Sequence, residues 1–423
     1  MSALPTATQA RQAAVFAGTL YRDRGLQWFN GRVRGDGLAR TRLKEGRHDR
    51  YAVYESIRAQ GPMVRTRMGN WVTTSHKVSN QVLRSRIFGV RDPELDIVQG
   101  GVSRDIDLSF LGLNPPDHGR LRRLAMPAFS PKMMHTYDTM IEKTVHQLVD
   151  RAEERGHFDL VTDLAAPLPI AVISEMMGVP NEHEADFQRY GAAIASALDG
   201  LNSLRHAREV IAANTALEAI FTSLFALRER EPRDDLVSTL VAQRGDRIRP
   251  HELTPMCQLL LVAGFETTVN LIGNAVIALS DHPDQWQTLV DDPRLAGSSV
   301  EETLRYLPPV QETGRVAFED TEIAGTSVRK QQWVVTLLAA AGRDPEVYEE
   351  PNRFDVTRTP GVEHLAFSSG VHYCIGAPLA RLEATVALRV LAERMPGLRR
   401  AGAVTMRGST TIRGPLHLPV TAH

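Results

Sequence analysis

The most informative stretch of this sequence is the loop HLAFSSGVHYCIG, which runs from His364 to Gly376. Gly370 and Gly376 free the backbone on both sides of Cys374, and Pro378 suits the first turn of a helix. Apolar residues then recur at helical spacing. Cys374 is therefore expected at a helix N-terminus, where free N–H groups and the helix dipole favour thiolate over thiol. A thiolate in such a tight turn is suited to hold a large, flat metal cofactor.

Taken alone, this cysteine has three other interpretations. Free cysteines are mostly inert core residues. His372 and Cys374 form a single His-x-Cys pair, which is too little for a zinc site that needs four ligands. A nucleophilic cysteine with a nearby histidine also stays open.

The spacing of the loop adds a resemblance. Phe367 stands seven residues before Cys374, Gly370 four before it and Gly376 two after it. With this spacing the loop resembles the haem-ligand loop of the cytochrome P-450 family, F-G-x-G-x-H-x-C-x-G. The resemblance implies that Cys374 binds the iron of haem b and that Phe367 and Gly370 contact the cofactor. Ser368 replaces the first glycine of the motif, and it is small enough to fit there.

A second motif lies in the segment NPPDHGRLRRL, where His118 and Arg122 are four residues apart and share one face of a helix. By itself this pattern indicates a solvated basic face. The third long helix of the family carries an H-x-x-x-R pair that binds the haem propionates, so the resemblance assigns that role to His118 and Arg122. Arginine suits it, because its fork meets a carboxylate with two charge-assisted bonds. Arg315 and His364 fall where relatives place further propionate ligands.

A long apolar helix is predicted from Thr254, as its N-cap, to about Ser280. Gly264 and the acid of Glu266 are unusual inside a buried helix. A satisfied polar contact between helices would explain the acid. The segment AGFET resembles the oxygen-binding groove of the family, A-G-x-E-T. This implies that Gly264 lets the helix widen, and that Glu266 and Thr267 are catalytic groups that deliver protons.

An E-x-x-R pattern follows at Glu302 and Arg305, which usually marks a surface ion pair of little energetic weight. It resembles the structural E-x-x-R of the family, in which an arginine from a later coil completes the set. Arg353 matches that arginine. The resemblance thus gives Glu302, Arg305 and Arg353 a structural role.

Composition limits the alternatives. The chain has 423 residues, 43% of them hydrophobic, and a net charge of −1, which gives no argument for nucleic acid or an anionic membrane. Two cysteines fit a reducing cytosol. No signal segment, membrane anchor or run of 18 apolar residues is found in the sequence, so a soluble, cytoplasmic protein is expected.

The rest of the chain gives a coarse order of elements. Residues 1–50 are expected to form an irregular arm with a short helix, and residues 88–113 an irregular segment that is functional or mobile. Gly69-Asn70 predicts a two-residue turn between strands, and strands are also expected from Arg315 to Leu338. Amphipathic helices are predicted within residues 132–250.

Six motifs occur in the order of the family between residues 114 and 376. The resemblance implies one mainly α domain with small β-sheets over residues 1–423, with haem between the long central helix and the cysteine loop. It further implies a monomeric monooxygenase without a reductase domain, which uses O2 and receives electrons from NAD(P)H through a ferredoxin and a ferredoxin reductase. A basic patch for the ferredoxin is expected at Arg120, Arg123 and Arg381.

The substrate is expected to be a lipophilic small molecule, since the candidate pocket is mostly apolar. The candidate pocket residues are Leu259, Val262, Ala263, Gln311, Thr313 and Ile412. Fatty acid, terpenoid, steroid and polyketide substrates stay open, and a role in secondary metabolism rests on analogy. Two other classes also stay open: a haem-binding sensor or carrier without turnover, and a cysteine-dependent hydrolase.

Overall fold

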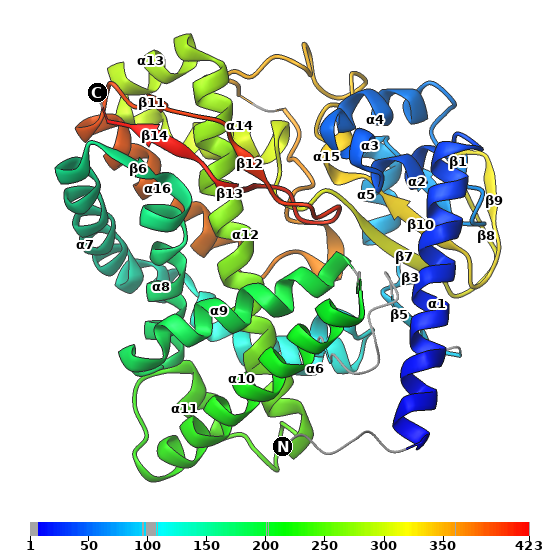
Figure 1. Ribbon diagram of the computed structural model, residues 1–423, viewed down its shortest axis with the longest axis horizontal. Helices are drawn as coiled ribbons and strands as arrows, with labels where there is room; N and C mark the ends of the chain where they lie inside the picture. Colours follow the sequence, from blue (N-terminus) through cyan, green and yellow to red (C-terminus); the bar gives the residue numbers. More distant parts are fainter. Residues whose placement is uncertain are drawn as a thin grey trace.

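The computed structural model describes residues 7–94, 97–98, 107, 109–199, 201, 203–359 and 361–422, and most of these are helical (Figure 1). The α-helices are α1 (Ala7–Arg32), α2 (Gly37–Thr41), α3 (Lys44–His48), α4 (Arg50–Arg58), α5 (His76–Arg84), α6 (Asp117–Ala125), α7 (Pro131–Arg155), α8 (Pro167–Met177), α9 (Glu184–Ala195), α10 (Leu204–Arg230), α11 (Leu236–Val241), α12 (Leu253–Asp281), α13 (Pro283–Asp291), α14 (Ala296–Tyr306), α15 (Leu338–Ala341) and α16 (Ala377–Arg394).

The strands are short and pair into small sheets. They are β1 (Val64–Arg65), β2 (Trp71–Thr73), β3 (Phe88–Gly89), β4 (Arg91–Asp92), β5 (Ile97–Val98), β6 (His157–Asp159), β7 (Thr313–Ala317), β8 (Thr321–Ile323), β9 (Thr326–Val328), β10 (Trp333–Thr336), β11 (Arg399–Arg400), β12 (Thr405–Met406), β13 (Pro415–His417) and β14 (Pro419–Thr421). Strands were expected within residues 315–338, and β7 to β10 lie there apart from the first two residues of β7.

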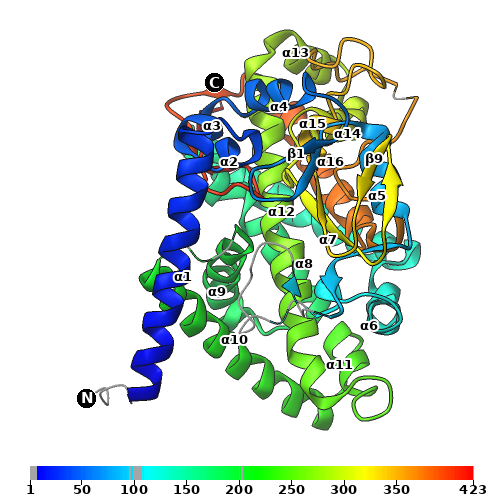
Figure 2. The same ribbon diagram turned by 90° about the vertical axis from the view of Figure 1, so that its right-hand side faces the viewer.

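Helix α12 forms the centre of the helical part. It is apolar around nearly its whole circumference, as a helix enclosed by other helices must be, and most of its residues are buried. Helices α8, α9, α14 and α16 pack against it. Figures 1 and 2 show α12 running through the middle of the molecule. The expected long central helix is therefore present.

The largest sheet has the strand order β1-β2-β10-β7-β3, in which only β2 and β10 run parallel. It lies to one side of the helices, beside α4, α5 and α15 (Figure 1). Its side chains join two small cores, one with Val53 and Ile57 of α4 and the other with Val78 and Val82 of α5. A mainly α fold with small sheets at one side agrees with the expected fold class.

The expectation for residues 1–50 is wrong. Helices α1, α2 and α3 occupy most of this segment, so it is not an irregular arm. The sequence pattern missed α1 because this helix has no clean apolar face: Tyr21 and Trp28 are exposed, and its described contacts are mainly with α2. Helix propensity without an amphipathic pattern leaves no periodic signal.

Three local expectations also need correction. The Gly69-Asn70 hairpin has a longer loop, since the N–H of Thr66 donates to the carbonyl of Asn70 at 2.8 Å. Helix α12 begins one residue before Thr254, and Glu252 is its N-cap because a 3₁₀ turn (Pro250–Glu252) leads into it. No widening occurs at Gly264, because α12 stays α-helical through it.

Within the described residues, two helical segments are long and apolar enough by composition to cross a membrane, α10 and Pro250–Asp281. The second contains α12, which is mostly buried inside the protein. Core helices of soluble proteins share this composition, so these features are weak support for a membrane span.

Candidate active site

Cys374 lies in the turn between a 3₁₀ segment (Gly370–His372) and α16. Its N–H donates to the carbonyl of Phe367 at 2.9 Å, which closes the loop. Desolvation by the surrounding protein raises the pKa of the thiol, although Cys374 keeps exposed surface, and the N–H groups of Gly376 and Ala377 and the charge of Arg122 oppose that shift. The N–H groups that the sequence predicted to favour thiolate are thus in place, opposed by desolvation. Bound metal would reverse the balance, because a coordinating thiol is deprotonated outright.

The backbone of the loop explains its small residues. Gly370 has φ 69°, and a Cβ there would lie 2.5 Å from the carbonyl oxygen of Leu83 in α5. Ser368, at the place of the first glycine of the motif, has φ 64°. A left-handed residue is needed at both positions, and the serine accepts this conformation at some cost in backbone energy.

Positive and imidazole groups gather beside the loop. The rings of His118 (α6) and His372 lie 4.1 Å apart between centroids, and Arg122 donates to the carbonyl of Tyr373 at 2.6 Å. Burial, then Arg122 and Arg315, lower the pKa of His118 to about 4. Burial likewise lowers the pKa of Arg315 to about 10. The structure thus brings His118, Arg122 and Arg315 together.

This cluster fits the carboxylates of haem. Among the residues that the structure describes, no carboxylate pairs with Arg122 or Arg315, and the buried Nε2 of His118 has no partner. Buried cations without counter-charges are costly. Two propionates placed here would supply the missing acceptors, and the Cys374 thiol beside them would supply a metal ligand. The donor set therefore suits a haem.

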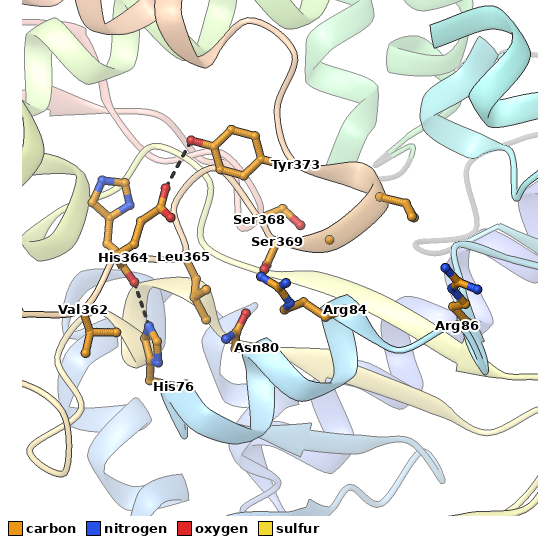
Figure 3. A pocket seen from close by; sticks show the side chains of 13 residues that line it. His76, Asn80, Arg84, Arg86, Val362, His364, Leu365, Ser368, Ser369 and Tyr373 are labelled. Carbon is orange, nitrogen blue, oxygen red and sulfur yellow. Dashed lines mark hydrogen bonds between the residues drawn. The ribbon is translucent and has the colours of Figure 1, made fainter. Parts of the chain in front are cut away.

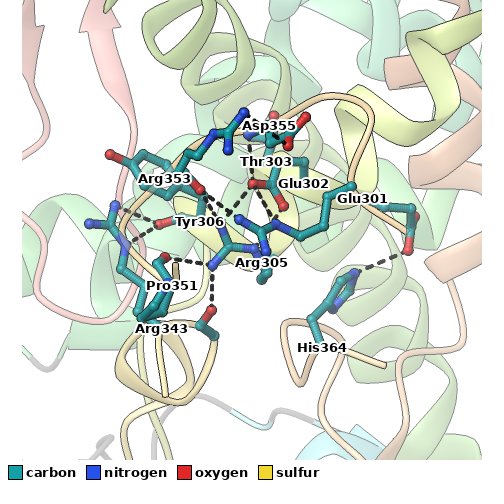
Figure 4. A network of polar contacts seen from close by, with 12 residues as sticks. Glu301, Glu302, Thr303, Arg305, Tyr306, Arg343, Pro351, Arg353, Asp355 and His364 are labelled. Atoms are coloured by element: carbon teal, nitrogen blue, oxygen red, sulfur yellow. Dashed lines mark hydrogen bonds and ion pairs between the residues drawn. The ribbon is translucent and has the colours of Figure 1, made fainter. Parts of the chain in front are cut away.

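His364 lies elsewhere. Its Nε2 is 3.2 Å from Glu301 of α14, and its Nδ1 accepts the N–H of Ala366 at 3.2 Å, so both ring nitrogens are engaged (Figure 4). The structure does not bring it to the cationic cluster. His372 takes that place instead, and the sequence offered the signal: it is the histidine of F-G-x-G-x-H-x-C.

One turn of α12 is accessible although most of this helix is buried. Ala263 is exposed and Thr267 is partly exposed, although their neighbours Leu259 and Val262 are buried. The Thr267 hydroxyl donates to the carbonyl of Ala263 at 2.7 Å, which leaves its oxygen lone pairs able to accept a hydrogen bond. This turn therefore offers an apolar wall with one hydroxyl.

Glu266 is adjacent to Thr267 in sequence, yet it is ion-paired. A guanidinium nitrogen of Arg407 lies 2.5 Å from Oε1 of Glu266, and the Glu266 side chain is only 4% exposed. Arg407 also donates to Asn270 at 3.1 Å. Burial raises the pKa of Glu266 and Arg407 opposes that shift. Its other oxygen, Oε2, is buried without a partner. No sequence pattern indicated Arg407, which lies in the C-terminal hairpin between β12 and β13.

The other three candidate pocket residues are differently placed. Gln311 is fully buried and donates to the carbonyl of Pro308 at 2.6 Å, while its Oε1 accepts from Arg50 at 3.3 Å. Gln311 therefore connects α4 to the coil that precedes β7, and it does not line a pocket. Ile412 is buried in a bridge to residue 310, and Thr313 receives a hydrogen bond from Arg315 at 3.1 Å.

The E-x-x-R pair is buried, not on the surface. Arg305 binds both oxygens of Glu302 at 2.7 Å, and each side chain is 2% exposed (Figure 4). Arg358 completes the set through Glu302 Oε1 at 3.3 Å. Arg353 was the wrong assignment: it contributes its backbone carbonyl to Arg305, and its side chain pairs with Glu350 at the surface.

A further ion pair, between α16 and α14, supports the cysteine loop. Arg381 of α16 binds Glu301 at 2.6 Å, donates to the Tyr373 hydroxyl at 3.1 Å, and lies 4.6 Å from the centre of the Phe367 ring. Together with Arg122 on its carbonyl, these contacts hold Tyr373, the neighbour of Cys374, at both ends.

Known proteins share this architecture. The family model described as Cytochrome P450 matches residues 294–394. The biotin biosynthesis cytochrome P450 of Bacillus subtilis is 37% identical over 357 residues, which cover 83% of this chain and 90% of the relative. Putative cytochrome P450 140 of Mycobacterium tuberculosis is 38% identical over 87% of this chain and 88% of its own length.

Solved structures agree. P450BioI in complex with acyl carrier protein ligated to hexadec-9Z-enoic acid superposes with a TM-score of 0.83 at 36% identity, over 89% of this chain and 98% of that one. Family members are monooxygenases that hold a thiolate-ligated haem and generally work with redox partners on lipophilic substrates. This excludes the hydrolase and the sensor without turnover. With the cysteine loop, the central helix and the E-x-x-R pair all in place, the chain belongs to the cytochrome P450 family.

Proposed function

We propose that this enzyme inserts one oxygen atom of O2 into a lipophilic small molecule, by hydroxylation or epoxidation. The other oxygen atom leaves as water, so each turnover consumes two protons and the two electrons of one NAD(P)H. A ferredoxin and a ferredoxin reductase deliver the electrons in the cytoplasm. The two thiols, Cys257 and Cys374, form no disulfide, which agrees with a reducing compartment.

The observation that carries the proposal is the open turn of α12. Its accessible surface is apolar at Ala263, with Leu259 and Val262 buried behind it, and Thr267 adds one hydroxyl. An apolar wall with few polar groups suits a ligand that is itself mostly apolar. The long acyl chain held by P450BioI is such a ligand.

Five residues of this chain would hold the haem. Cys374 would bind the iron, His118, Arg122 and Arg315 would bind the propionates, and His372 would lie beside them. When bound, the haem supplies the oxygen-activating chemistry, which a thiolate ligand favours by donating electron density. Phe367 and Gly370 fix the loop that positions the sulfur.

Glu266 and Thr267 would then move protons. The Arg407 side chain is 19% exposed whereas that of Glu266 is 4% exposed, so the ion pair extends from a partly exposed residue to a buried one. Glu266 Oε2, the oxygen without a partner, is the atom that would hold the proton. A raised carboxyl pKa suits this task, because it makes the group a better proton acceptor than an ordinary carboxylate. Thr267 would receive the next hydrogen bond.

Isotope labelling tests the proposal. Lipophilic compounds that shift the haem absorption spectrum are first selected by titration. Each is then incubated with NAD(P)H, a ferredoxin, its reductase and ¹⁸O₂. We expect one labelled oxygen atom per product molecule, and loss of the product in Cys374→His together with the red-shifted carbon monoxide band. Product without label would refute the proposed reaction.

A further inference from the structure

Residues 407–414 join β12 to β13 and form the tip of the C-terminal hairpin. The N–H of Arg407 donates to the carbonyl of Gly414 at 3.0 Å, which closes the base of the tip. This base packs closely on α12, since a Cβ at Gly414 would lie 2.0 Å from Oδ1 of Asn270. The hairpin therefore carries Arg407 directly beside the part of α12 that holds Glu266.

Arg47 of α3 holds the far side of the tip. Its guanidinium donates to the carbonyl of Gly408, the residue after Arg407, at 2.8 Å. In return, the Arg413 side chain donates to the backbone carbonyl of Arg47 at 2.9 Å. The tip thus extends past α12 to the N-terminal helices (Figure 1).

Arg50 of α4 holds the same side of the tip from the interior. It is 2% exposed and donates to the carbonyls of Thr410 at 2.6 Å and Ser409 at 3.3 Å. Among the residues that the structure describes, Arg50 forms no ion pair, and its other acceptor is the neutral Gln311. A buried cation without a counter-charge is costly. The carbonyls of the tip therefore cannot leave Arg50 without exposing that cost, which makes this contact firm.

Arg407 needs such an anchor in order to stay on Glu266. Its side chain is long and partly exposed, so water competes with Glu266 for its hydrogen bonds. Holding such a side chain in one conformation costs entropy, and the cost is larger when the backbone at its root also moves. Contacts on both sides of the tip therefore favour the ion pair over a solvated Arg407.

We propose that Arg47 and Arg50 are positioning residues that fix the hairpin tip and thereby keep Arg407 on Glu266. Through this anchor, the N-terminal helices determine whether the buried acid faces a cation when it takes up or releases a proton. Loss of the anchor has the same effect on Glu266 as loss of Arg407, but to a smaller extent. The part that concerns proton transfer rests on the proposed function, whereas the anchor itself is a property of the folded protein.

The cysteine loop lies apart from this anchor. The groove on its outer side is lined by α5, the turn after α5, and the loop with the two residues before it (Figure 3). None of the described lining residues belongs to the hairpin tip, α3 or α4. The basic patch predicted near the loop is separate too, and it is largely neutralised, because Arg120 pairs with Glu252 and Arg381 with Glu301, each at 2.6 Å. The carbon monoxide spectrum, which reports the cysteine ligand, should therefore not change when the anchor is removed.

Thermal unfolding of the haem-loaded protein at about pH 5 and about pH 8 tests the anchor. Arg407 is the charged group that acts on Glu266, beside the neutral amide of Asn270. At the lower pH an unpaired Glu266 takes up a proton, but at the higher pH it must stay charged in a buried site. We therefore expect the Tm loss of Arg47→Ala to be about two- to threefold larger at the higher pH. Adding Glu266→Gln should remove this difference, because an amide does not titrate.

Three further variants separate positioning from general stabilisation. Arg47→Lys keeps a donor for the Gly408 carbonyl and should restore most of the Tm. Arg50→Lys keeps the buried charge but cannot meet two carbonyls with a fork, so it should show the same pH-dependent loss as Arg47→Ala. Arg40→Ala is the control, because Arg40 of α2 is exposed and has no described contact with the hairpin, and its Tm loss should be equal at both pH values.

Two results would overturn the anchor. One is a Tm loss of Arg47→Ala and Arg50→Lys that is equal at both pH values or keeps its pH dependence with Glu266→Gln. The other is the same pH-dependent loss in Arg40→Ala.

The ratio of product to NAD(P)H tests the role of the anchor in proton delivery. We expect Arg47→Ala to lower this ratio about twofold or more and to release the missing electrons as hydrogen peroxide. An unchanged ratio would restrict the anchor to stability and overturn its part in the reaction. If the unmodified enzyme forms no labelled product, the proposed function fails, whereas the unfolding data still decide the anchor.

Discussion

Arg407→Ala should make the stability of this enzyme depend more strongly on pH. Arg407 is the cation that faces the buried carboxylate of Glu266, at 2.5 Å. Burial already raises the pKa of Glu266, and Arg407 partly offsets that shift. Without the arginine, the carboxyl group must either stay charged in a buried site or take up a proton.

The two choices set the size of the effect. A buried charge left without its partner costs about 3–5 kcal/mol of folding free energy. Protonation of Glu266 avoids that cost where the pH is low enough. The variant then loses only the hydrogen bond from Arg407, which is about 1 kcal/mol of folding free energy. The pKa of Glu266 in the folded state lies above its ordinary value, so the folded protein binds more protons than the unfolded chain between the two values. Stability therefore falls as the pH rises through this window, and Arg407→Ala extends the window upward.

Thermal unfolding of the haem-loaded protein at about pH 5 and about pH 8 measures the effect. The Tm of Arg407→Ala should lie slightly below that of the unmodified protein at the lower pH and far below it at the higher pH. Adding Glu266→Gln should remove the difference between the two pH values, because a neutral amide does not titrate. Arg400→Ala is the control, since Arg400 forms an exposed pair with Asp281. A Tm loss that is equal at both pH values, or that persists with Glu266→Gln, would refute the reasoning.

Three further predictions concern single residues. Thr267→Ala should still consume NAD(P)H but divert electrons to hydrogen peroxide, because the hydroxyl of the open turn is lost; an unchanged ratio of product to NAD(P)H would assign the relay to another group. Arg358→Ala should destabilise the protein by about 1–3 kcal/mol, because it leaves Glu302 and three carbonyl groups with fewer hydrogen-bond donors. Arg353→Ala, the control, should cost under about 1 kcal/mol. Equal losses of the two variants in denaturant unfolding would contradict this prediction. Gly370→Ala should weaken haem retention in gel filtration, because the added Cβ meets the Leu83 carbonyl in a left-handed backbone; full retention would show that the loop can shift.

The elements that the sequence predicted well have local signals. The cysteine loop is one continuous segment whose glycines and proline act on their own neighbours, and α12 has an apolar run of the length of a buried helix. His118 and Arg122 are one helical turn apart, so their shared face needs no knowledge of the rest of the fold. The fold class was expected because these segments resemble motifs of the cytochrome P450 family.

The misassignments involve partners that are distant in sequence or lie in coil. Arg353 and Arg358 are five residues apart in the same irregular segment, and no periodicity indicates which side chain turns toward Glu302. Gln311 is polar and close to the expected pocket, yet Arg50, 261 residues away, draws it into another contact. Arg407 reaches Glu266 from the C-terminal hairpin. Only tertiary structure determines such pairs.

The positive charges around the cysteine loop divide into three groups. On the side of α6, Arg122 and Arg315 have no acid among the described residues, and carboxylates placed there would neutralise their charges. On the side of α16, Arg381 is already neutralised by Glu301 and serves to hold Tyr373. Because Arg315 is buried and Arg122 is half-buried, binding of the propionates should stabilise the folded state by linkage, so haem loading and folding are coupled. Arg84 and Arg86 form the third group, which is exposed, and repulsion there costs little in water. A surface charge of this kind contributes little to the free energy of folding.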